Sequence, residues 1–204
     1  MRAWLAASVA WVGAGFLTAQ PETLPMPANG TVHVRNSAGE LAVEGWDRPE
    51  VELTTAKSVE GAKVAMTRQG DAIVIDTSLP KKAERDRMDY RIRMPRGAKL
   101  TVEHGDGEIH VAELAGDIHA TVRHGEIVLS LPADGRYGID ARASLGGVVS
   151  DFAGQSRRRP WIFGHWFQSG KQAGQTHQLY LRAGFGDILI LKTIRPAPPG
   201  RQTE

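Results

Sequence analysis

A short phrase recurs along this sequence: a glycine, usually an acidic residue, and then an aliphatic residue that begins an alternating stretch. It occurs at Gly39–Val43, Gly107–Val111, Gly116–Ala120, Gly125–Leu129 and Gly186–Ile190. Glycine can adopt the positive φ of a tight corner, and alternating apolar residues bury one face of a strand. The phrase therefore predicts a repetitive all-β fold in which short strands meet at glycine corners.

The spacing of the repeats leaves two architectures open. Gly107, Gly116 and Gly125 are evenly spaced, and the phrase Val102–Val111 recurs in a shorter form as Val122–Leu129. Near-copies favour a right-handed parallel β-solenoid with short rungs, because stacked rungs face the same environment at each position. An antiparallel β-sandwich is the alternative, since its strands have similar lengths and turns. The predicted inward positions are Val102, Ile109, Val111, Ile118, Val122, Ile127, Leu129, Val148, Leu181, Ile188 and Ile190.

The beginning of the chain has the pattern of a signal peptide over residues 1–19. Arg2 precedes an apolar run from Trp4 to Leu17, and small residues lead to Gln20, where the mature chain is expected to begin. An uncleaved segment that anchors the chain in a membrane is the alternative. No later stretch is apolar enough for a transmembrane helix, and the sequence contains no cysteine. We therefore expect an exported protein without disulfides, in the periplasm, at the cell surface or secreted.

The remaining sequence predicts one domain. We expect a proline-rich lead-in over residues 20–29, a β-repeat domain over residues 30–194 and a disordered tail over residues 195–204. A hydrophobic fraction of 41% suffices for one core. The formal net charge is only +2, with acidic and basic residues interspersed, so a nucleic-acid partner is not expected.

An excursion over residues 153–177 interrupts the repeats and combines arginines with large aromatic residues. Aromatic rings beside arginines can stack on sugars, insert at a membrane interface or anchor a protein, and arginines attract carboxylates and phosphates. Alternatively, these rings fold back to cover the core or a strand edge. The candidate binding residues are Arg157, Arg158, Arg159, Trp161, Phe163, Trp166 and Phe167.

Histidines and corner acids are candidates for metal binding or catalysis. His104 and His124 each precede a glycine in neighbouring repeats, so stacked rungs would bring their rings together. The spacing supplies no clear further ligands, and neither a metal nor another cofactor is expected. Glycosidase chemistry needs two carboxyls at a set separation in a cleft, whereas corner acids ordinarily keep turns solvated. With no nucleophile elbow, phosphate loop or dinucleotide motif, we expect no enzyme.

Three features in order resemble the bacterial putative adhesin family of β-strand repeat proteins. They are Val43–Val51, Ile92–Leu100 and the glycine–acid–isoleucine repeats, and the resemblance covers roughly residues 30–192. It implies an exported, repetitive parallel β-fold and brings no catalytic residues to transfer. On this basis we expect a non-enzymatic, adhesin-like scaffold of the cell envelope that presents a binding surface to glycan or protein. A polysaccharide-acting enzyme and a self-assembling structural protein are the alternatives, and the sequence does not indicate an oligomeric state.

Overall fold

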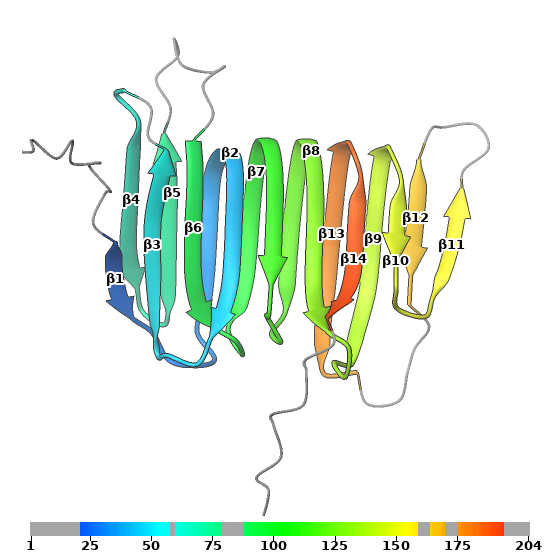
Figure 1. Cartoon of the computed structure of the whole chain (residues 1–204), viewed down its shortest axis with the longest axis horizontal. Coiled ribbons are helices and arrows are strands. Elements are labelled where there is room, and N and C mark those ends of the chain that lie inside the picture. Colours follow the sequence, from blue (N-terminus) through cyan, green and yellow to red (C-terminus); the bar gives the residue numbers. More distant parts are fainter. Residues whose placement is uncertain (1–20, 58–59, 79–87, 159–163, 170–174, 194–204) are drawn as a thin grey trace, which may run out of the picture.

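The computed structural model describes residues 21–57, 60–78, 88–158, 164–169 and 175–193. These ranges contain fourteen strands, which join one hydrogen-bonded network. Figure 1 shows the strands as an elongated body in which two layers face each other and the chain arches from one layer to the other along one edge. The described ranges contain no helix, and so none that could span a membrane.

Long strands that turn a corner form the centre of the body. The residues before and after each corner belong to different layers: the first of these strands in the chain, for example, pairs with residues 72–76 before Gly39 and with residues 88–95 after it. Gly39, Gly107 and Gly125 lie at the corners with φ angles of 107°, 129° and 140°, a region that favours glycine. The strands are β2 (Thr31–Trp46), β7 (Lys99–Ala112) and β8 (Ile118–Pro132).

Three further rungs are each made of two shorter strands, one per layer. The rungs are β5 (Ala72–Ser78) with β6 (Met88–Pro95), β13 (His177–Phe185) with β14 (Ile188–Thr193), and β9 (Tyr137–Leu145) with β10 (Val148–Ser150). Neighbouring rungs pair in parallel in the order β5/β6, β2, β7, β8, β13/β14, β9/β10. The parallel solenoid is confirmed, and the last rung in the chain lies between β8 and β9.

Antiparallel strands flank the rungs at both ends. At one end, β3 pairs with β6, β1 with β3 and β4 with β5. At the other end, two strands from the excursion extend one layer beyond β9, so the excursion continues the sheet. The bounds are β1 (Glu22–Pro25), β3 (Glu50–Lys57), β4 (Lys63–Gln69), β11 (Gln155–Arg158) and β12 (His165–Gln168).

The core lies between the two layers. Alternation along each rung sends every second side chain inward, where it meets the equivalent residue of the next rung. For example, Val102, Ala120 and Leu181 follow one another across one layer and are fully buried. All of the predicted inward positions are buried, the most exposed being Val148 at 9%.

Candidate functional site

The excursion presents an aromatic ring and an arginine on the outside of the sheet. In β12 the alternation turns Phe167 into the core, where it is 6% exposed, and turns Trp166 outward. Arg157 of β11 lies directly opposite Trp166, and its guanidinium carbon is 5.9 Å from the centre of the Trp166 ring. Of the predicted binding residues, Trp166 and Arg157 thus belong to an outer surface, whereas Phe167 belongs to the core.

The structure does not test the other four predicted binding residues. Arg159, Trp161 and Phe163 lie outside the described residues, and Arg158 is described only through its backbone in β11. Their binding role therefore stays a prediction.

Two neighbouring strands extend this outer surface with residues that the sequence did not single out. Arg142 of β9 pairs with Trp166 in register, and its guanidinium carbon lies 5.3 Å from the ring centre. On β13, the guanidinium carbon of Arg182 lies 3.6 Å from the centre of the Tyr180 ring, and Tyr180 is 40% exposed. We call this surface the aromatic–arginine face; its members are Asp140, Arg142, Arg157, Trp166, Tyr180 and Arg182.

One carboxylate holds two of the arginines in place. The Asp140 side chain accepts hydrogen bonds from Arg182 at 3.0 Å and from Arg142 at 3.2 Å. Burial raises the pKa of Asp140, but the hydrogen bond and charge of Arg182, the charge of Arg142 and the nearby Trp166 indole N–H together lower it. No well-aligned hydrogen bond joins the indole N–H to Asp140. Asp140 is therefore ionised at neutral pH and fixes the two guanidinium groups.

A histidine lies beside the aromatic–arginine face. His119 of β8 lies 4.4 Å from Tyr180, ring centre to ring centre. Burial lowers the pKa of His119, the charges of Arg182 and Lys99 lower it further, and Glu103 only partly opposes them. Such a histidine is neutral at pH 7, and its ring extends the row of flat side chains.

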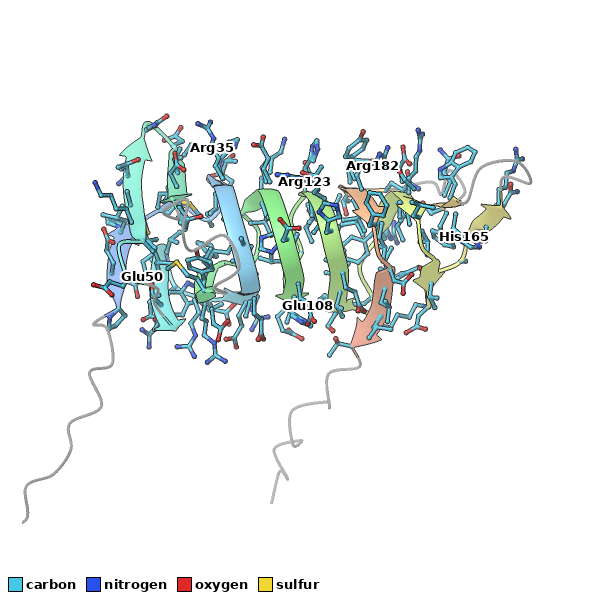
Figure 2. The ribbon with its side chains drawn as sticks, turned by 90° about the horizontal axis from the view of Figure 1, so that it is seen from above. Arg35, Glu50, Glu108, Arg123, His165 and Arg182 are labelled. Carbon is cyan, nitrogen blue, oxygen red and sulfur yellow. The ribbon has the colours of Figure 1, made fainter. Side chains whose placement is uncertain are left out.

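Charged side chains lie on the outside of both layers. Figure 2 shows Arg35, Arg123 and Arg182 along one side of the body, and Glu50 and Glu108 along the other. Three arginines against one aspartate give the aromatic–arginine face a local excess of positive charge that the small net charge of the chain conceals. The arrangement is suited to holding an anionic or sugar-like ligand on an open surface.

His104 and His124 do not lie side by side as stacked repeats had led us to expect. Pairing follows the glycine–acid–isoleucine phrase, so His104 is opposite Val122, and His124 is opposite Asp106. His104 is buried, with Nε2 3.1 Å from the Gly39 carbonyl oxygen, whereas His124 is exposed and lies 2.7 Å from Asp106. No group of three potential metal ligands occurs in the part of the chain that the structure describes.

Corner acids form a row along the arched edge. Glu40, Glu108 and Glu126 follow one another in register, with Asp89 beside Glu40. The row lies where the chain arches between layers, whereas glycosidase chemistry needs carboxyls that converge in a cleft.

A hollow of about 390 Å³ at the opposite edge brings together one acid and several basic residues. Its lining includes Asp134, Arg96, Arg136 and His177. It does not provide the pair of carboxyls that glycoside cleavage requires.

Comparison with known proteins finds a family model that matches most of the chain and a solved structure of similar fold. The family model described as Toastrack DUF4097 matches residues 28–188. A solved structure of a putative cell adhesion protein from Clostridium sporogenes superposes with a TM-score of 0.52 at 12% identity, covering 85% of this chain and 99% of that one. This likeness supports the fold alone.

A putative adhesin from Bacteroides fragilis, at 8% identity, covers 84% of this chain and 96% of its own. Its TM-score of 0.28 is too low to establish a shared fold. No curated protein matches the sequence.

Proposed function

Because the chain belongs to the Toastrack DUF4097 family, as its resemblance to repeat adhesins predicted, we propose that it is an exported, adhesin-like scaffold that binds an envelope glycan. The observation that carries the proposal is the position of Trp166 between Arg142 and Arg157 on the outside of the sheet. Aromatic rings provide large, rigid contact area, and arginines provide directed hydrogen bonds. Regular strands hold all three side chains, which limits the ordering cost of binding.

A second tryptophan on the other layer provides a matched comparison. The guanidinium carbons of Arg48 and Arg93 lie 5.0 and 5.9 Å from the centre of the Trp46 ring. Arg93 is paired with Glu44 at 3.3 Å and with Glu52 at 3.4 Å, so its charge is balanced locally. We assign this second cluster to the stability of its end of the sheet and not to ligand binding.

The test is capture of fractionated cell-envelope material by the purified protein. We expect Trp166→Ala to reduce capture at least 10-fold, whereas Trp46→Ala leaves capture unchanged. Thermal unfolding of both variants identifies any loss that comes from unfolding. Equal capture by Trp166→Ala and the parent protein would refute the proposed site. An equal loss of capture in Trp166→Ala and Trp46→Ala, with both variants folded, would show that binding is not specific to the layer that carries Trp166.

A further inference from the structure

Within the proposed function, on which this inference rests, the chemistry of the ligand follows from how the face is laid out. We infer that the ligand is a linear polysaccharide carrying carboxylates, which crosses the strands at a right angle and places about one sugar ring over each strand. The inference depends on the register of four strands, on a second row of polar residues and on the charges that bound the surface.

The first row runs across four consecutive strands. Arg182 of β13, Arg142 of β9, Trp166 of β12 and Arg157 of β11 are register partners, one from each strand. Register partners lie on the same face of a sheet, about 4.8 Å apart. Each sugar of an extended 1,4-linked chain advances by a length similar to this strand spacing, so successive rings can meet successive strands. Carboxylates at this repeat would meet the arginines in turn.

A second row runs beside the first and supplies polar groups. Tyr180, Asp140, Gln168 and Gln155 are register partners on the same four strands. Gln168 and Gln155 are exposed, and amides both donate and accept hydrogen bonds. A sugar ring with a carboxylate on one side and hydroxyls on the other therefore finds a complementary partner on each side.

The surface has a boundary that limits the length of the ligand. Beyond Arg182, the same row continues with Thr121 of β8 and then Glu103 of β7. Glu103 would repel a carboxylated chain, and among the described residues β11 is the last strand at the other end of the layer. The favourable part of the row therefore spans four strands and accommodates about four sugars at the ~4.8 Å strand spacing.

The mixture of groups on the face favours this ligand over a polyanion that offers charge alone. Asp140, two aromatic rings and two amides lie among the three arginines, so a ligand that supplies hydroxyls and ring surface beside its charges is complementary to more of the face. A carboxylated sugar chain alternates charge with hydroxyls and ring surface, as the face alternates arginine with Trp166, Tyr180 and the amides.

The test measures binding of defined oligosaccharides to the full-length protein by calorimetry. The probes are oligomers of galacturonic, mannuronic and glucuronic acid with two to eight sugars, their methyl esters, and poly-L-glutamate as a flexible polyanion. We expect at least one uronic-acid series to bind, with affinity rising up to about four sugars and little thereafter. Its methyl ester and poly-L-glutamate should bind at least 10-fold more weakly.

Paired variants place the ligand on the row. Replacing both Arg142 and Arg157 by Gln should weaken binding at least 10-fold, whereas Arg35→Gln, on the same layer but distant in the row, should leave it within 2-fold. Equal binding of the ester overturns the requirement for charge, and equal binding of poly-L-glutamate overturns the requirement for a sugar. If no uronic-acid series binds while envelope capture still depends on Trp166, this inference fails and the proposed function stands. If envelope capture fails as well, both fail.

Discussion

Replacing one corner glycine by alanine tests whether close backbone contact between rungs determines this fold. Gly125 has a φ of 140°, and a Cβ added there would lie 1.7 Å from the Gly107 carbonyl oxygen. The same contact recurs along the corner, at 2.0 Å from Gly107 to the Gly39 oxygen and 1.9 Å from Gly186 to the Gly125 oxygen. Because the obstructing atoms belong to the backbone, a rotamer change cannot relieve the overlap.

The expected cost of Gly125→Ala has two parts. A non-glycine residue at this φ costs roughly 1–3 kcal/mol. Moving Gly107 away to normal contact also disrupts the β7–β8 ladder at the corner, where each lost hydrogen bond costs about 1 kcal/mol or more. With one or two ladder hydrogen bonds lost, we expect Gly125→Ala to lower the free energy of unfolding by ~2–5 kcal/mol, a large part of the roughly 5–15 kcal/mol by which domains are typically stable.

Gly70 offers a matched control because it has a positive φ without the crowding. Its φ is 64°, and nothing lies within 4 Å of an added Cβ. Gly70→Ala should cost about 1 kcal/mol, because the left-handed conformation is unfavourable for alanine while the unfolded state loses flexibility. Urea unfolding at constant temperature measures both variants. A loss at Gly125 no larger than the loss at Gly70 would show that contact between rungs is not the reason for the corner glycines.

Two further predictions concern charge. Burial lowers the pKa of His104 below 6.5, and the hydrogen bond to Gly39 and the charge of Asp106 only partly oppose this shift. Because the unfolded state then binds more protons than the folded state, the free energy of unfolding should fall as the pH drops below about 6.5. His104→Gln removes up to one of these protons and should reduce the slope of the unfolding free energy against pH by up to about 1.4 kcal/mol per pH unit. An unchanged slope between about pH 5 and 7 would contradict this. Glu126→Gln should stabilise the protein by ~0.5–1 kcal/mol in low salt by removing repulsion from Glu108, and the gain should shrink in high salt. A gain that does not depend on salt in urea unfolding would exclude repulsion as its cause.

The sequence predicted the rungs well because each rung obeys local rules. Alternation identified the buried positions, and the glycine–acid–isoleucine phrase identified corners that the structure places at Gly39, Gly107, Gly125 and Gly186. Gly116, which is part of the same phrase, is different: it lies at the opposite edge with no positive φ, where an added Cβ would meet the Ala98 carbonyl oxygen at 2.1 Å. The same kind of glycine phrase therefore occurs at two different types of close backbone contact, and only the neighbouring strands in the structure distinguish the two types.

The register in which neighbouring rungs pair was less predictable than the position of the rungs in the sequence. Aligning the two His–Gly pairs gave the wrong partners for His104 and His124, because β7 has two more residues between its histidine and the corner glycine than β8. The phrase that packs most tightly determines the pairing, and with the corner glycines aligned the two histidines are offset by two positions. The contact of Gly125 with Gly107 is that phrase, and it leaves His104 inside and His124 outside.

The candidate site was only half visible in the sequence for a topological reason. Trp166 and Arg157 are close in the chain and stood out by composition. Arg142 joins them because β12 pairs with β9, and Tyr180 and Arg182 join them because β13 pairs with the other side of β9. Sequence order would place β9 next to β8, which would leave Asp140 without its hydrogen bond from Arg182. The insertion of the final rung at this position therefore does more than complete the core: it brings the charges of β9 and β13 together. The aromatic–arginine face is consequently complete only when β13 lies beside β9, because β13 contributes Tyr180 and Arg182.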